Sequence, residues 1–300
     1  MNGNSYNREI VRLPQQQVWG KSAVLNFALG GSGAGLYIVM FFSINILNAI
    51  AGASHNFHKI FAPTLVAIGF LALACETRFP LRIVHLANNL YSSWMSRETL
   101  FGVAFIILAG LDFFRPHSVF ELLAVFSALG YLVSQSFILY RSVAVTAWNT
   151  EIAPLTILLS SIYGGMGWCL MMIGAPELTN AKMLMFVFAV ILLNALAWLF
   201  YVLKAVKIKL SEKKSGFRFW SRKKLSLFVA QIIPIAALSL IAMSDGFRGH
   251  GPLYTASFRT LSALLILAFS FHQKSVIIKL FSQFRSINLG FPEQYDGKDS

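Results

Sequence analysis

The sequence predicts an all-α integral membrane protein, a bundle of about eight transmembrane helices with both termini on the cytoplasmic side. Of its 300 residues, 56% are hydrophobic and only 12% are charged, whereas about a quarter of a soluble domain is charged. The 27 Phe residues would give a soluble fold of this size larger apolar patches than a monomer exposes. Long apolar runs separate the charged residues, so the composition excludes soluble enzymes.

Eight apolar segments are the expected spans, because a transmembrane helix requires about 20 mostly apolar residues. The six strongest are the uncharged runs 22–58, 60–75, 122–140, 152–176, 183–203 and 225–244. The first helix is expected to leave the membrane near Ala51, where small and polar residues gather. Two segments are weaker, since 99–111 is short and 254–273 contains Arg259.

The distribution of basic residues favours eight helices over six and predicts their orientation. With eight helices, 20 of the 25 Lys and Arg residues fall on one side, which the positive-inside rule identifies as the cytoplasm. The chain then divides into a polar N-terminal segment (1–21), a membrane domain (22–280) and a polar C-terminal tail (281–300). The expected location is the cell (inner) membrane.

The densest basic segment is the predicted cytoplasmic loop 204–224, which carries nine Lys and Arg residues. Two interpretations are open: a topology determinant that faces anionic lipid, or a docking surface for an acidic partner subunit. Because the net charge of +13 is distributed between apolar spans, we do not expect nucleic acid as a partner.

Metal and haem sites are not expected within this chain. Its two cysteines, Cys75 and Cys169, both lie in apolar runs and cannot form a disulfide framework or a Cys-rich metal site. The six histidines lie in predicted loops or at span ends, which disfavours a bis-histidine haem. The Gly-rich run 30–35 lies inside an apolar helix with no strand before it, so it is not a nucleotide-binding loop. It either permits close helix packing or forms a smooth wall beside a flat ligand.

Polar residues inside apolar spans are the candidate binding residues, because each needs a partner or a function there. Asn26 lies about one turn into the first helix, after Trp19 and Ser22, and Tyr131 lies in the half of its helix nearer the cytoplasm. Both side chains can hydrogen-bond a carbonyl oxygen, as a quinone head group requires. The alternative for each is an ordinary interhelical hydrogen bond, and Trp19 alone is typical of an interfacial anchor.

The stretch 75–98 combines a helix end, a proline and several charged residues at the cytoplasmic boundary. Its charged residues are Glu76, Arg78, Arg82, Arg97 and Glu98. They are either snorkelling side chains with local ion pairs or, for the two carboxylates, groups that pass protons to a buried redox site.

Three segments resemble the membrane subunit of molybdenum-dependent respiratory oxidoreductases, the NrfD/PsrC (polysulfide reductase) family with its dimethyl sulfoxide reductase anchor relatives. The first is Trp19-x6-Asn26-Phe27 with the following glycine run. The second is Glu76-x3-Pro80-x-Arg82 followed by 93–98 (SWMSRE), and the third is Trp148-Asn149-Thr150 with Pro154 and Gly164-Gly165. The resemblance covers roughly 19–165. It departs from the family at Arg78-Phe79, which precede Pro80, and at Asn26, where the polysulfide reductase branch has His.

The resemblance implies a membrane anchor and quinone-reactive subunit of an anaerobic respiratory complex, with no catalytic residues for the primary substrate. Its partners would be a four-cluster iron–sulfur subunit and a molybdopterin catalytic subunit, here on the cytoplasmic side. Electrons would pass between the iron–sulfur partner and membrane quinone (menaquinone or ubiquinone).

The residues receive three roles under this interpretation. The quinone-binding residues are Asn26, Tyr131, Ser22 and Trp19. The proton-delivering residues are Glu76, Glu98 and Glu151. The docking residues are Arg78, Arg82, Trp94 and Arg97. The alternatives are a secondary transporter and a purely structural anchor that lacks quinone.

Overall fold

The computed structural model describes residues 19–50, 56–76, 90–91, 93–173, 180–212 and 252–282. Within these ranges all regular secondary structure is helical. Six of the helical segments are long and apolar enough to cross a membrane. The predicted class, an all-α multi-pass membrane protein, is therefore confirmed.

The first predicted span is one long helix that contains two π-helical segments. It consists of α1 (Lys21–Leu25), the π-helical segment η1 (Asn26–Gly30), α2 (Gly31–Phe41) and a second π-helical segment η2 (Phe42–Ile46). The remaining helices are α3 (Phe57–Glu76), α5 (Trp94–Phe114), α6 (Ser118–Tyr140), α7 (Ile152–Met172), α9 (Ala181–Glu212) and α11 (Pro252–Ser275), which continues into the π-helical segment η7 (Val276–Leu280).

Seven of the eight predicted spans coincide with these helices, and the eighth, 225–244, lies outside the described residues. Helix α5 extends well beyond the predicted segment 99–111 at both ends, although it is not among the six most apolar helices. Helix α9 continues to Glu212, so the first part of the predicted basic loop 204–224 is helical. Long Lys side chains permit this, because their stems cover apolar surface while the ammonium reaches water.

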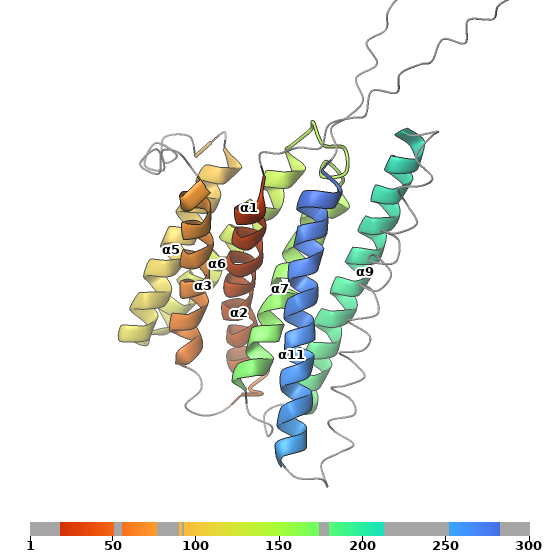
Figure 1. The fold of residues 1–300 in the computed structure, drawn as a ribbon. Helices are drawn as coiled ribbons and strands as arrows, with labels where there is room; N and C mark the ends of the chain where they lie inside the picture. The colour runs from red at the N-terminus through yellow and green to blue at the C-terminus, as the bar shows by residue number, and fades with distance from the viewer. Residues whose placement is uncertain are drawn as a thin grey trace, which may run out of the picture.

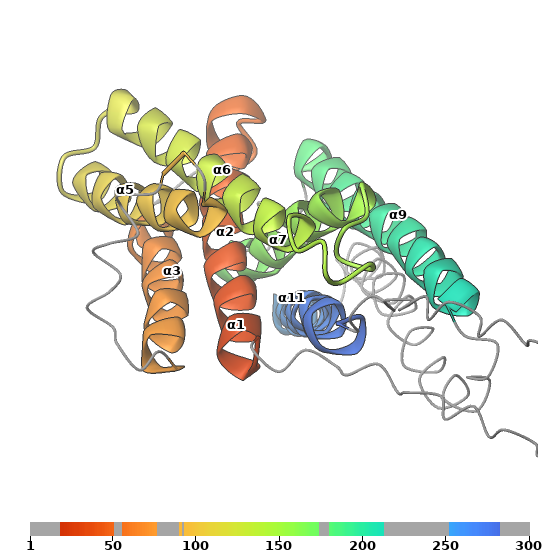
Figure 2. The ribbon, with the colours of Figure 1, turned by 90° about the horizontal axis from the view of Figure 1, so that it is seen from above.

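From the first helix to α9, successive helices run alternately down and up, and α11 runs up as α9 does (Figure 1). In Figure 1, the start of α1, the ends of α9 and α11 and the connection between α6 and α7 all lie at the upper end of the bundle. Seen from above, α5 and α6 lie side by side at one edge, α9 lies at the other, and α1 and α2 stand between them (Figure 2). These are the helix ends that the charge distribution assigns to one side of the membrane.

Glycines let α2 and α7 pack so closely that the backbones of the two helices are in contact. A Cβ atom on Gly165 would collide with the backbone of Gly35 and Leu36, and a Cβ on Gly35 would collide with the Ser161 carbonyl. Small residues at this spacing allow close contact between membrane helices. The glycine run 30–35 therefore contributes to helix packing, one of the two roles considered for it.

Candidate functional site

Four polar side chains meet inside the bundle at the upper end of the first helix, α5 and α6. They are Asn26, Glu98, Tyr131 and Gln135, and we call them the Glu98 cluster. Asn26 begins the π-helical segment η1, Glu98 lies near the start of α5, and the other two lie one turn apart on α6. All four are buried, and Glu98, the most exposed, is only 4% accessible.

The four side chains are connected by hydrogen bonds around the Glu98 carboxylate. Asn26 Nδ2 donates to Glu98 Oε1 at 2.9 Å, and Gln135 Nε2 donates to the same oxygen at 3.2 Å. Gln135 Nε2 also lies 3.1 Å from the Tyr131 hydroxyl, which donates to Asn26 Oδ1 at 3.4 Å. Within the described part of the chain, neutral donors thus stabilise the buried carboxyl group in place of a direct ion pair.

Glycines provide the room for this cluster. A Cβ on Gly30 would collide with the Tyr131 hydroxyl, and a Cβ on Gly69 of α3 would stand 2.9 Å from Asn26 Oδ1. A Cβ on Gly102 of α5 would stand 3.0 Å from the Tyr131 ring. The η1 segment is a local departure from α-helical geometry at the same place, and such π segments are frequent at functional sites.

The first turn of α5 is fixed by local contacts that place Glu98 inward. The Ser93 hydroxyl accepts a hydrogen bond from the Ser96 N–H at 3.4 Å and caps the helix. Arg97 donates to the Tyr91 carbonyl at 2.7 Å, and its guanidinium lies 4.3 Å from the centroid of the Trp94 ring. The predicted docking residues Trp94 and Arg97 therefore pack against each other on the same turn as Glu98.

The other two predicted quinone-binding residues lie at the start of the first helix, Ser22 in α1 and Trp19 two residues before it. Ser22 is half-buried one turn before Asn26. The Trp19 ring packs at 5.9 Å from both Phe27 and Trp148. The structure thus brings together Asn26, Tyr131 and Glu98, and it places Trp19 and Ser22 on the turns that lead to them.

Of the remaining predicted site residues, Glu151 lies outside the cluster. Glu151 precedes α7, its side chain is 88% exposed, and its carboxylate lies 3.5 Å from Lys204 Nζ. It lines an apolar groove of about 350 Å³ between α6 and α7, together with Phe137 and Tyr140. Glu76 ends α3, and the predicted docking residues at 78 and 82 lie outside the described residues.

Gln135 is a member of the cluster that the sequence analysis missed. It follows Tyr131 by four residues, and residues at this spacing lie on the same face of a helix. A search for polar residues one turn from Tyr131 would have found it, because an amide inside an apolar span needs a partner as much as a tyrosine does.

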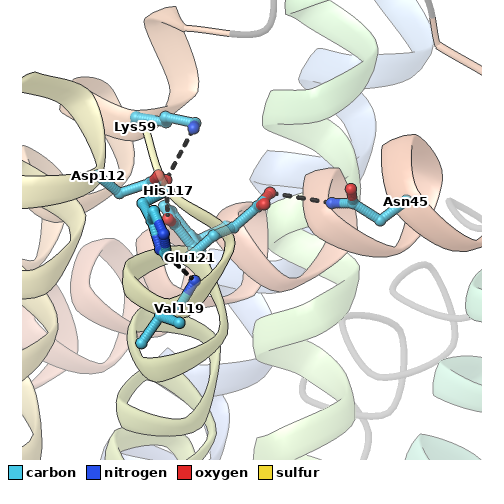
Figure 3. Close-up of polar contacts among 7 residues, drawn as sticks. Asn45, Lys59, Asp112, His117, Val119 and Glu121 are labelled. Carbon is cyan, nitrogen blue, oxygen red and sulfur yellow. Dashed lines mark hydrogen bonds and ion pairs between the residues drawn. The ribbon is translucent and has the colours of Figure 1, made fainter. Parts of the chain in front are cut away.

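A second set of buried polar contacts lies at the opposite end of the same helices. Lys59 Nζ of α3 lies 2.8 Å from Asp112 Oδ2 of α5, and both residues are buried. The Tyr37 hydroxyl donates to the same oxygen at 2.7 Å. Next to this ion pair, Asn45 Nδ2 donates to Glu121 Oε1 at 2.9 Å (Figure 3).

The fold and these contacts define a multi-pass membrane protein with ionisable side chains inside its helix bundle. Within the described residues, no group of three or more His, Cys, Asp or Glu side chains could hold a metal ion. No family model matches the chain, and no curated protein matches it.

Proposed function

We propose that the chain is the membrane anchor and quinone-reactive subunit of a molybdopterin and iron–sulfur oxidoreductase complex. The observation that carries this proposal is the meeting of Asn26, Glu98 and Tyr131 in one buried, hydrogen-bonded cluster. These three residues belong to three different helices, and the resemblance to the NrfD/PsrC family concerns the segments that contain the first two.

The Glu98 cluster has the chemistry that a quinone head group requires. A quinone presents carbonyl oxygens that accept hydrogen bonds, and the cluster offers donors on Asn26, Tyr131 and Gln135. When quinone is reduced to quinol by two electrons from an iron–sulfur partner, it also takes up two protons. A doubly charged anion would otherwise remain in a low-dielectric environment.

Glu98 is the best-placed proton donor among the three predicted carboxylates. It lies within the cluster at 2.9 Å from Asn26, close to the end of the bundle where α5 begins. Glu151 is exposed and paired with Lys204, so we assign it at most a role in proton entry at the surface.

In this proposal the partner subunits bind at the end of the bundle where α5 begins, because the Glu98 cluster and the Trp94–Arg97 turn lie there. This is the upper end of the bundle in Figure 1. The charge distribution puts this end in the cytoplasm. A complex with a cytoplasmic catalytic head would oxidise a cytosolic substrate and reduce quinone. Protease protection of a C-terminal tag in right-side-out membrane vesicles tests this orientation, and cleavage from the outside would contradict it.

Co-purification tests the proposed function directly. The full chain, tagged and isolated from native membranes in mild detergent, is expected to bring down subunits that contain molybdenum and iron, with quinone in the lipid extract. Metal analysis and quinone chromatography measure both. A preparation that contains quinone-free single chains, without molybdenum or iron, would contradict the proposal.

A secondary transporter is the second candidate function, and the buried Lys59–Asp112 ion pair favours it. Together with Glu98, this pair places ionisable groups near both ends of α5, and π-helical segments interrupt the first helix beside each set. Transporters bind solutes at such interrupted helices. The same co-purification separates the two functions, because a transporter has no molybdenum-containing partner.

A further inference from the structure

A buried lysine, Lys274 of α11, lies beside the Glu98 cluster. Lys274 of α11 is 1% exposed, and its Nζ atom forms no hydrogen bond with any part of the chain that the structure describes. In the sequence Lys274 directly follows the predicted span 254–273, which would put it among the cytoplasmic charges, whereas the structure buries it inside the bundle.

Lys274 Nζ lies close to Gly31, where a larger residue would not fit. If Gly31 had a Cβ atom, Lys274 Nζ would lie 3.0 Å from it, Gln135 Oε1 2.9 Å and Ser161 Oγ 2.5 Å. Three polar atoms from α6, α7 and α11 therefore converge beside one glycine of α2. Among the described residues, neither Lys274 Nζ nor Gln135 Oε1 has a hydrogen-bond partner.

The Gln135 amide separates Lys274 from Glu98. Its Nε2 atom donates to Glu98 Oε1 at 3.2 Å, while its Oε1 atom lies close to Gly31, as Lys274 Nζ does. The Gln135 side chain thus lies between a buried acid and a buried base. It is uncharged and can rotate about three bonds, so it can change its position without moving a buried charge.

An unpaired lysine inside a membrane protein is costly, and such residues are retained where they bind something. Asn26 is the first residue of the π-helical segment η1, and Lys274 lies two residues before the π-helical segment η7. The helix that carries Lys274, α11, packs against η1.

We propose that Lys274 binds the second carbonyl oxygen of the quinone head group, the one that faces away from Glu98. This inference rests on the quinone function proposed above. A quinone ring carries its two oxygens on opposite sides, and the site would offer Glu98, Asn26 and Tyr131 at one side and Lys274 with Ser161 at the other. The Gln135 amide would move aside to admit the ring. The positive charge of Lys274 would favour the oxygen that becomes negative on reduction.

Equilibrium binding of menaquinone-1 and ubiquinone-1 to the full chain in lipid nanodiscs tests this inference. We expect Lys274→Met to weaken binding of the preferred quinone by about tenfold or more, as for the loss of one hydrogen bond to a charged donor. Lys207→Met is the matched control, because it removes the same charge from the exposed side of α9, and it is expected to leave affinity unchanged.

Glu98→Gln, measured in parallel, distinguishes the failure of this inference from the failure of the proposed function. If the unaltered chain binds neither quinone, both are wrong. If Glu98→Gln weakens binding while Lys274→Met binds within twofold of the unaltered chain, only the role of Lys274 is wrong. Should Lys274→Met not fold, Lys274→Gln serves in its place, because it removes the charge and keeps a polar group; binding within twofold would again overturn the role.

Discussion

Replacing Tyr131 with Phe separates a role in quinone chemistry from a role in packing. The substitution removes only the hydroxyl of a fully buried side chain, whose ring packs 5.8 Å from that of Phe70. Glu98 keeps its bond from Asn26 at 2.9 Å, and Gln135 Nε2 keeps Glu98 as acceptor at 3.2 Å. The bond that Asn26 Oδ1 loses is long, at 3.4 Å.

The expected loss of folding stability is therefore small, about 1 kcal/mol, the net value of an ordinary hydrogen bond. The expected loss of function is larger. A hydrogen bond to an oxygen that becomes charged contributes about 1.5–3 kcal/mol, and 1.4 kcal/mol corresponds to a factor of ten. We thus expect Tyr131→Phe to lower quinone turnover by about tenfold or more while the complex still assembles.

The assay is quinone reduction by the purified complex with a reduced viologen dye as electron donor, beside thermal unfolding and subunit stoichiometry. Tyr163→Phe is the control, since Tyr163 is equally buried in α7 and its hydroxyl has no partner within the described residues. Unchanged turnover in Tyr131→Phe would refute the role of the hydroxyl at the quinone. Loss of assembly would show that the hydroxyl serves packing.

Two further predictions concern the framework around the site. Removing one member of the buried Lys59–Asp112 pair, as in Lys59→Met or Asp112→Asn, leaves the other buried group without its partner and should destabilise the fold by about 3–5 kcal/mol. Lys204→Met, in the exposed pair with Glu151, is the control and should cost at most about 1 kcal/mol. Equal decreases in unfolding temperature for the buried and the exposed pair would contradict this prediction. Gly165→Ala should disrupt the contact between α2 and α7 and clearly lower the unfolding temperature. Gly110→Ala is the control, because its Cβ would meet nothing within 4 Å, and it should be neutral or stabilise α5 by up to about 1 kcal/mol. An unchanged unfolding temperature in Gly165→Ala would show that the two helices can separate without loss of stability.

The sequence predicted the helices well because apolar length is a local property. The predicted length of α5 was too short, because Glu98 and Asp112 were taken as the limits of the span. The structure places both carboxylates inside a helix that runs from Trp94 to Phe114, where each has partners from other helices. A charge that is compensated within the bundle does not end a membrane helix, and sequence position alone does not reveal the compensation.

The candidate site was predictable in part for a similar reason. Counting helical turns placed Asn26 and Tyr131 at the same depth, and the structure joins them through a hydrogen bond. Depth does not identify which helices are neighbours, so the sequence did not connect Gln135 or Lys274 with them. Lys274 lies on α11, far along the chain, and only the packing of that helix beside η1 brings it near Gly31.

The two carboxylates of α5 differ in how they are compensated, and this difference is our reason for proposing the quinone site at Glu98 and not at Asp112. Asp112 has a direct ion pair with Lys59 at 2.8 Å. A ligand that replaced either partner would leave the other buried charge unpaired, which is strongly unfavourable. Among the residues that the structure describes, the donors within hydrogen-bonding distance of Glu98 are neutral. These donors can exchange one acceptor for another without separating opposite charges, so the Glu98 end of the bundle can bind and release a polar head group while the Asp112 end holds the helices together.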